Sequence, residues 1–478
     1  MSQINESAIK TPGVYTTEIP AFPPSVAQVA TAIPAFIGYT ENDTDTKGNS
    51  WHLKPKRITS LLEYQQTFGG APKESNLAVK IVEHHDSGGN LVSADVTASI
   101  SGSPSTKYLM FYALQMFFMN GGGPCYIVSV NTYTTGGGSV AHADLQKGLD
   151  SIEPEDEPTL IVFTDGSAVD TSANYYTLQN NALALCAKLQ DRFSLIDVYD
   201  NTNDTGTNAS NFRSGIGANN LNYGATYYPN LVTVLSYSYD DTAVPLTISV
   251  AGGGAAKLTS THLDGLAGEN KVVYNQASSA VQQLGIALSP SAAIAGVMAA
   301  VDATRGVWKA PANVSLNGVQ SLSDNVTDES QGGLNIDAGS GKSINAIRSF
   351  IGKGILVWGS RTLDGNSNDF RYVPVRRFFI MVEESVKKAT MQFVFEPNDS
   401  NTWVRVRGMI ENFLTNLWRL GALAGAKPEQ AFYVRVGLGV TMTFDDVLNG
   451  KMIVEIGMAP VRPAEFIILR FTQIQQTS

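Results

Sequence analysis

The sequence predicts an α/β (α+β) protein of several domains, and three observations lead to that prediction. The apolar runs at 126–130 and 160–163 are short and continuous, as in parallel strands buried on both faces. A helical pattern over 175–189 precedes another strand-like run at 193–198, and such alternation is typical of α/β domains. At 478 residues, the chain is long enough for about two to four domains.

The N-terminal segment is predicted to be an extended arm. Residues 11–25, TPGVYTTEIPAFPPS, begin with Pro12 and Gly13 and end with prolines that prevent regular continuation. Residues 30–41, ATAIPAFIGYTE, predict the first buried strand of a folded domain. Within the arm, between Gly13 and Pro20, one potential strand has side chains that alternate between two faces. It consists of Val14, Tyr15, Thr16, Thr17, Glu18 and Ile19.

The middle of the chain, from about 58 to 290, mixes helical, strand-like and polar segments. The apolar stretch 108–119 is shorter than the ~20 residues that span a bilayer, so we expect a buried helix there. Gly, Ser, Thr and Asn are frequent in 86–104, 201–222 and 251–256. We expect these three segments to be surface loops or loop-rich insertions.

Two further helices are predicted in the C-terminal half. The first begins with Ser289 as its cap and Pro290 at its first position, and Gly306 ends it. The second runs from about 401 or 402 to Gly425. The last segment, 451–474, has two strand-like runs separated by a turn around Pro460 and Pro463. The apolar positions of the second helix follow a 3.6-residue period: Val406, Met409, Ile410, Phe413, Leu414, Leu417 and Leu420.

Composition narrows the function classes. Only 16% of the residues are charged, against about 25% in a typical soluble protein, which suggests that other molecules cover much of the surface. The net charge of −10 argues against a protein that binds nucleic acid by neutralising phosphates. Residues 1–344 hold 17 basic and 31 acidic residues (−14), and residues 345–478 hold 16 and 12 (+4). That asymmetry suggests two parts with different neighbours, although two ordinary domains with different solvated faces would also produce it.

Cysteine usage and the N-terminus point to a reducing compartment. Cys125 and Cys186 are only two cysteines, too few for a disulfide scaffold or a cysteine-rich zinc module. No basic region followed by an apolar core opens the sequence. We therefore expect assembly in the cytoplasm, without a signal peptide.

Three motifs suggest chemistry, and each fails on spacing. GSGKS at 339–343 has the end of a phosphate-binding loop, but Ile336 stands where that loop needs its first glycine. NDTDTKG at 42–48 resembles the start of a calcium loop, but Lys54 replaces the expected bidentate glutamate. His84 and His85 have no second pair of ligands at a useful spacing. The sequence therefore predicts no catalytic residue, no cofactor site and no metal site.

Several segments together resemble the tail sheath proteins of contractile phage tails and related injection systems. The ordered set consists of the N-terminal arm with ATAIPAFIGYTE, SPSAAIAGVMAAVDATRGVWKAPAN at 289–313, FRYVPVRRFF, FEPND at 395–399, TWVRVRGMIENFLTNLWRLGALAGAKPEQAFYVR and KMIVEIGMAPVRPAEFIILRFTQI. The resemblance covers the first 40 residues and nearly all of 289–478, and it is poor between about 85 and 285. AFPPSVAQVATAIPAFIGYTE is more similar to extracellular injection systems than to ordinary phage sheaths.

The resemblance implies a mechanical, non-enzymatic role. A sheath subunit of this family polymerises as helically stacked hexameric rings around an inner tube. It contracts from a metastable extended state and drives the tube through a target membrane. The implied partners are neighbouring sheath subunits, the inner tube, and baseplate and cap proteins, without nucleic acid and without direct membrane insertion. The alternatives within the family are the sheath of a contractile-tailed phage and a cap or baseplate-proximal paralogue of the sheath. A secreted hydrolase or carbohydrate-binding protein is an alternative from a different class.

The implied organisation places the assembly residues in the arms. We expect a linker arm at 1–28, an outer and middle α/β region with variable insertions at 29–344, and a conserved inner domain at 345–478 whose last part, about 464–478, is a strand arm. Each arm could add a strand to a neighbour's sheet, or could pair within its own chain. Arg405, Arg407 and Arg419 are candidate contacts to an acidic inner tube, although each could pair with a neighbouring sheath subunit instead. The C-terminal candidates for strand donation are Phe466, Ile467, Ile468, Leu469, Arg470 and Phe471.

Overall fold

The computed structural model describes residues 25–134, 138–199, 202 and 204–470. These residues form two compact units. The smaller unit contains 25–29 and Val382–Val461, and the larger contains Ala30–Met381 and 462–470. The division falls within helix α10 (Val373–Thr390), whereas the sequence predicts a boundary at 344/345. Residue 345 instead begins a strand of the larger unit's central sheet, because packing rather than composition sets the division.

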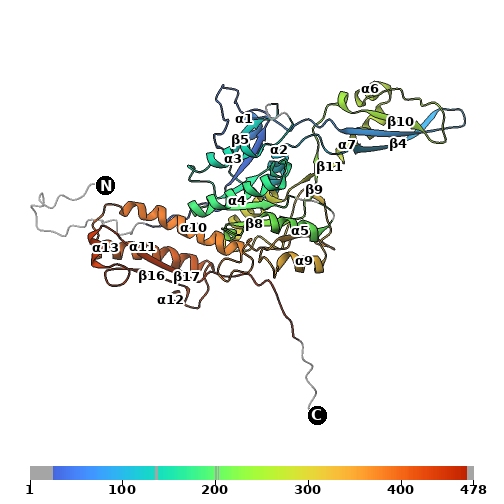
Figure 1. The fold of residues 1–478 in the computed structure, drawn as a ribbon. Coiled ribbons are helices and arrows are strands. Elements are labelled where there is room, and N and C mark those ends of the chain that lie inside the picture. The colour runs from blue at the N-terminus through green and yellow to red at the C-terminus, as the bar shows by residue number, and fades with distance from the viewer. Residues whose placement is uncertain (1–24, 135–137, 200–201, 203, 471–478) are drawn as a thin grey trace, which may run out of the picture. The chain divides into compact units, whose positions relative to one another are not determined.

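A nine-stranded sheet forms the centre of the larger unit (Figure 1). Its order is β12-β15-β14-β8-β7-β6-β1-β5-β2, and the six strands from β14 to β5 are parallel. The apolar runs at 126–130, 160–163 and 193–198 lie in these parallel strands, which confirms the α/β prediction. The bounds are β1 (Pro34–Thr40), β2 (Lys56–Ile58), β5 (Cys125–Thr132), β6 (Leu160–Phe163), β7 (Phe193–Asp197), β8 (Gly224–Tyr228), β12 (Val314–Ser315), β14 (Asn345–Phe350) and β15 (Gly354–Val357).

Helices pack against this sheet. The predicted buried helix is α2 (Met110–Met119), and among the described residues no helix is long and apolar enough to cross a membrane. Helix α8 (Ser291–Arg305) packs closely on α2, since a side chain at Gly296 would meet the backbone oxygen of Phe117 at 2.4 Å. The other helices of this part are α1 (Leu61–Phe68), α3 (His142–Ser151), α4 (Ser172–Leu189), α5 (Thr205–Gly215) and α9 (Asp328–Asn335).

The start of α8 differs from the prediction. Ser289 makes no cap; the helix begins two residues later, and Asp197 at the end of β7 supplies the capping carboxylate. Its oxygens accept hydrogen bonds from the backbone N–H of Ser291 at 3.0 Å and from the Ser291 hydroxyl at 2.7 Å. The predicted end is confirmed, because the chain leaves the helix at Gly306 with a φ of +90°.

Two segments predicted as loops contain regular structure. Segment 86–104 holds β4 (Leu91–Ile100), which pairs antiparallel with β3 (Leu77–His85), and 201–222 holds α5. Along β4, polar residues on the exposed face alternate with less exposed apolar residues on the other face. This period of two residues is not visible in the composition of the segment. β10 (Leu246–Val250) completes this sheet, beside α6 (Leu263–Glu269) and α7 (Lys271–Gln282). A further sheet contains β11 (Gly285–Leu288), β9 (Leu231–Ser236) and β13 (Val319–Leu322).

The smaller unit combines helices with a two-stranded sheet. Its long helix is α11 (Ser400–Arg419), which ends before the predicted Gly425 because the chain turns at Gly421 with a φ of +84°. The predicted apolar face is buried except for Leu420, which lies beyond the last turn and is exposed. The remaining elements are α12 (Pro428–Ala431), β16 (Phe432–Val436), α13 (Phe444–Leu448) and β17 (Val454–Met458).

Candidate assembly interface

The C-terminal arm leaves the larger unit as an exposed apolar run. Phe466, Ile467, Ile468 and Leu469 are each 66–78% exposed, and Arg470 is exposed beside them. Within the described part of the chain, residues 466–470 belong to no strand. Four consecutive exposed apolar side chains are unfavourable in water, so this run calls for a partner surface. Phe471 lies outside the described residues.

The arm is held at Glu465, the residue immediately before the run. Its carboxylate accepts hydrogen bonds from Arg361 Nη2 at 2.6 Å and from Asn335 Nδ2 at 2.6 Å. The Tyr372 hydroxyl donates a third at 3.1 Å. Partial burial by itself raises the pKa of Glu465, but the hydrogen bonds from Arg361 and Asn335 outweigh it and hold that pKa below its ordinary value. The root of the arm is therefore fixed in place.

The N-terminal arm is described only from its root. Val14, Tyr15, Thr16, Thr17, Glu18 and Ile19 lie outside the described residues. Where the description begins, the backbone N–H of Val29 donates to Ser385 Oγ at 3.1 Å, within the smaller unit. Within the larger unit, the Thr31 hydroxyl donates to Asp302 at 2.6 Å, and the Thr31 carbonyl accepts from Arg377 at 2.7 Å.

The two-stranded sheet of the smaller unit has open edges. Among the described residues β16 pairs only with β17, in antiparallel register from Phe432 opposite Met458 to Val436 opposite Val454. One face packs on α11. On the other face the Tyr433 ring lies over Gly457, where an added Cβ would be 2.2 Å from the ring. Open edges are where another chain can add a strand.

The lysine of GSGKS has a structural role that its sequence motif conceals. Lys342 is buried, and its Nζ donates to the carbonyl oxygens of Arg213 at 2.5 Å and Ile216 at 2.6 Å. These carbonyls belong to the end of α5, where helices leave backbone acceptors without intrahelical partners. Burial lowers the pKa of Lys342. The side chain thus caps a helix rather than facing a phosphate loop.

The other two sequence motifs also have local partners. Asp45 accepts hydrogen bonds from the backbone N–H groups of Lys47 and Asn49, each at 2.9 Å, and hydrogen bonding to Asn49 lowers its pKa to about 2. His84 contacts Asp95 at 2.8 Å, and His85 contacts Glu83 at 2.5 Å. Among the residues that the structure describes, no group of three His, Cys, Asp or Glu side chains could hold a metal ion.

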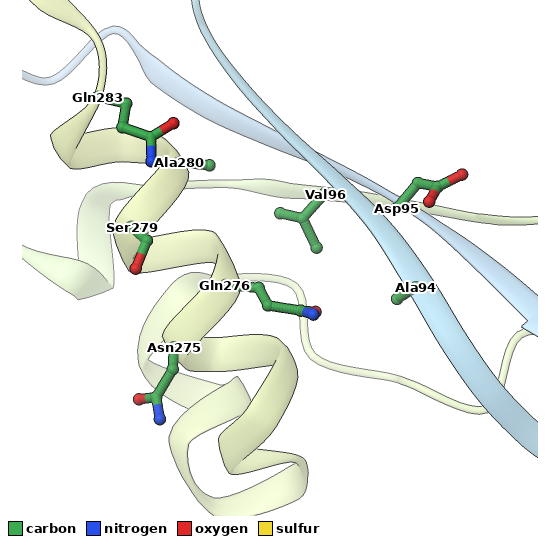
Figure 2. Close-up of a pocket in the computed structure, with 8 residues that line it drawn as sticks. All are labelled: Ala94, Asp95, Val96, Asn275, Gln276, Ser279, Ala280 and Gln283. Carbon is green, nitrogen blue, oxygen red and sulfur yellow. The ribbon is translucent and has the colours of Figure 1, made fainter.

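A surface pocket between β4 and α7 is lined mainly by amides and small side chains (Figure 2). Its volume is about 530 Å³. Gln276 reaches from α7 toward the strand, while Asn275 and Asp95 point away from one another. These amide groups can donate and accept hydrogen bonds, but the lining pairs no nucleophile with a base. The lining residues are Ala94, Asp95, Val96, Asn275, Gln276, Ser279, Ala280 and Gln283.

Comparison with known proteins identifies the family to which this chain belongs. The phage tail sheath protein central domain matches residues 138–363, and the phage tail sheath C-terminal domain matches 366–474. The sheath of the extracellular contractile injection system PVC, in its contracted state, is 32% identical and covers 97% of this chain and 98% of its own, with a TM-score of 0.64. The chain belongs to the contractile tail sheath family.

Other relatives of this sheath chain agree. The helical sheath of the anti-feeding prophage in its contracted state is 33% identical, covering 97% of this chain and 99% of its own, with a TM-score of 0.62. A chain of the anti-feeding prophage baseplate is 34% identical, covering 98% and 100%, also at 0.62. The tail sheath protein of Vibrio phage KVP40 is 23% identical over 469 residues, and the match spans 93% of this chain but 61% of that protein. The predicted similarity to injection-system sheaths is confirmed.

The arginines of α11 partly pair with neighbouring carboxylates. Arg405 lies 3.8 Å from Glu396 and stacks over the Phe393 ring at 5.4 Å. Arg407 lies 3.8 Å from Glu411, one turn along the helix. Arg419 is exposed in the last turn, where a positive charge favours the helix terminus. All three side chains are accessible, but a carboxylate lies near two of them: Glu396, which precedes α11, and Glu411 on the helix itself.

The positive excess of the C-terminal part of the sheath chain lies elsewhere than the sequence suggests. The 16 basic and 12 acidic residues of 345–478 divide as 6 and 2 in 345–381, 8 and 9 in 382–461, and 2 and 1 in 462–478. The excess thus comes mainly from the larger unit, where Arg361, Arg376 and Arg377 are buried. The unit that contains α11 has no net positive charge in 382–461, so its net charge would not attract an acidic partner. If α11 binds such a partner, individual arginines must make the contact.

Proposed function

We propose that this chain is the repeating structural subunit of a contractile sheath in a phage tail-like injection particle. Subunits stack as hexameric rings wound helically around an inner tube, and contraction from a metastable extended state drives the tube through a target membrane. The observation that carries the proposal is the exposed apolar run at 466–469, which directly follows the hydrogen-bonded Glu465. It occurs in a chain that also has a two-stranded sheet with open edges.

Strand donation gives this run a physical role. In an extended strand, Phe466 and Ile468 face one side and Ile467 and Leu469 the other. Both faces are apolar, so the strand gains most where it is covered on both sides. Full burial of four such side chains contributes roughly 6–10 kcal/mol before the cost of ordering the arm. Adding it to a neighbour's β16–β17 sheet also satisfies edge backbone groups.

The contact generates a filament because it is heterologous. Donor and acceptor are different surfaces of the same chain, and repeating such a contact without closure gives a helical polymer. The N-terminal strand at 14–19 is the second proposed donor, which would link each subunit to another neighbour. Baseplate and cap proteins would close the ends of the polymer. The sheath would assemble in the bacterial cytoplasm and would be released as part of the particle.

Removing the donated strand tests the proposal. Truncation after Glu465 leaves the anchor in place, and the truncated chain should stay folded but fail to form cylinders in negative-stain microscopy. Val272→Ser on α7 removes an exposed apolar side chain elsewhere and should polymerise as the unaltered chain does. Long sheaths from the truncated chain would refute strand donation by the C-terminal arm.

A grip on the inner tube is proposed for Arg405, Arg407 and Arg419. Reversing each charge to Glu, singly and together, should weaken co-assembly with the tube, most strongly at Arg419. Lys427→Glu, at an exposed position of the same unit outside α11 and the β16–β17 sheet, is the matched control. Undiminished co-assembly of the triple variant would reject the tube contact and favour pairing with sheath neighbours.

A baseplate-proximal or cap paralogue of the sheath is the second candidate. The 34% identity to a chain of the anti-feeding prophage baseplate is as high as that to the helical sheath. Microscopy of the purified chain separates the two roles, because a main sheath forms long striated cylinders and a paralogue forms single rings or short stacks.

A further inference from the structure

One end of the smaller unit presents an unusually apolar surface. At this end α10 finishes, α11 begins and β16 connects to β17 (Figure 1). A hydrogen bond of 2.9 Å from Asn398 Nδ2 to the Lys451 carbonyl ties the two connections together. We call this surface the apolar end; its exposed members are Met391, Val394, Phe395, Leu438, Val440, Phe444, Leu448 and Ile453.

Phe395 is the most prominent member. Its side chain is 103% exposed, and its backbone has a φ of +70°, in the left-handed region that bulky residues rarely adopt. The loop is rigidly built around it. Phe393, two residues earlier, is buried, the Val394 N–H donates to the Met391 carbonyl at 3.2 Å, and Trp403 Nε1 donates to Asn398 at 2.7 Å. A residue that a hydrogen-bonded loop holds in this rarely adopted backbone region is a candidate for a functional role.

The second connection is equally ordered. Helix α13 has a capping box in which Thr443 Oγ1 accepts from the Asp446 N–H at 3.2 Å and Asp446 accepts from the Thr443 N–H at 3.0 Å. Phe444 and Leu448 project from this short helix and are largely exposed. Both connections are therefore already ordered in the monomer. A partner that binds them would lose little free energy to the ordering of loops and side chains.

The distribution of exposed apolar side chains marks this end. Of 22 large exposed ones among the described residues, seven lie in 30–381, eleven in 382–461 and four in the C-terminal arm. The first stretch is more than four times as long as the second. Two phenylalanines and six further apolar side chains are thus exposed in two neighbouring connections, whereas exposed apolar side chains that need no explanation are scattered singly.

We propose that the apolar end is a contact between sheath subunits, occupied by a second copy of this chain. The proposal rests on the sheath function proposed above. Residues 382–461 carry 8 basic and 9 acidic residues, so two copies of this unit meet without net repulsion. Its two exposed phenylalanines are of the residue class that is enriched at the centres of protein interfaces.

The inner tube is the competing occupant, and the chemistry disfavours it. A sheath must release its tube when it contracts, whereas strongly apolar interfaces are typical of permanent association. The sheaths similar to this chain remain polymers in the contracted state. An apolar contact therefore suits subunits that stay together throughout contraction.

Site-specific crosslinking identifies the occupant. Benzoylphenylalanine replaces Phe395 in the full chain, assembled with its tube protein, and the crosslinked peptides are identified by mass spectrometry. Ile351, 106% exposed at the turn between β14 and β15, carries the same probe as a matched control. A crosslink from 395 to a second sheath copy, stronger than that from 351, supports the proposal. A crosslink to the tube protein, or none above the control, overturns it.

Polymerisation gives an independent measure. Phe395→Ser with Leu448→Ser should raise the critical concentration for sheath formation by at least about tenfold, as expected when interface hot spots are lost. Ile351→Ser should leave it unchanged, and thermal unfolding checks that each variant is folded. If the double variant polymerises normally while truncation after Glu465 blocks assembly, this inference fails and the sheath proposal stands. If the truncated chain also polymerises, the sheath's arm-exchange proposal fails as well.

Discussion

Arg361 and Glu465 form an ion pair of 2.6 Å at the point where the C-terminal arm leaves the folded protein. Arg361 is buried and Glu465 is partly buried. One residue further on, the chain becomes a run of exposed apolar side chains. The pair therefore separates a part of the chain that is fixed in the monomer from a part available to a neighbour.

Removing the charge at this position should loosen the arm's root. Glu465→Gln keeps the size of the side chain but leaves the buried Arg361 without its counter-charge. We expect the free energy of unfolding to fall by about 3–5 kcal/mol, measured by urea denaturation, and sheath assembly to weaken. Arg462→Gln, at an exposed neighbouring position, should change little. Equal stability of both variants would contradict a structural role for the pair.

A second ion pair joins distant parts of the larger unit. Arg377 of α10 donates to Asp302 of α8 at 3.1 Å, both side chains are buried, and Thr31 contacts both residues. Asp302→Ala should lower the free energy of unfolding by about 3–5 kcal/mol because Arg377 keeps a buried charge. The double variant Asp302→Leu with Arg377→Met should recover much of that loss. If the two substitutions are additive in a double-mutant cycle, the pair does not act as a unit.

Stability should depend on pH through Asp197. Burial raises the pKa of Asp197 from 3.8 to about 7, so the folded protein favours the protonated form. Its stabilising contribution is complete below about pH 4 and is lost as the pH rises through 7. Relative to Asp197→Asn, wild-type stability should fall by an amount on the order of 4 kcal/mol between pH 4 and 8. Urea titrations of both proteins across this range check the prediction, and parallel pH profiles would contradict it.

The sequence could predict the elements whose local pattern matches their environment. The run LIVF at 160–163 is buried on both faces as a central parallel strand, so its continuous hydrophobicity is informative. Helix α11 shows its buried face through the period of Val406, Met409 and Ile410. In both cases a few neighbouring residues contain the whole signal.

Other features depend on partners far away in the chain. Glu465 and Arg361 are 104 residues apart, and no local period connects them. Asp197 caps a helix that begins 94 residues later, which is why Ser289 seemed the better cap from the sequence. Strand β4 is polar on its open face, so its composition is that of a loop. The arm's apolar run was visible in the sequence, but its anchor and the backbone of Phe395 required the folded structure.

The contact between Tyr433 and Gly457 provides a test of the sheet that we propose as the strand acceptor. The two residues are directly opposite each other, and the Tyr433 hydroxyl donates to Glu455 at 2.7 Å. Gly457→Ala should displace the ring and lower the free energy of unfolding by about 1–3 kcal/mol. In Tyr433→Ala the ring is absent, so adding Gly457→Ala should cost almost nothing more. Urea denaturation of the three variants measures this coupling, and full additivity would show that the ring does not depend on a glycine beneath it.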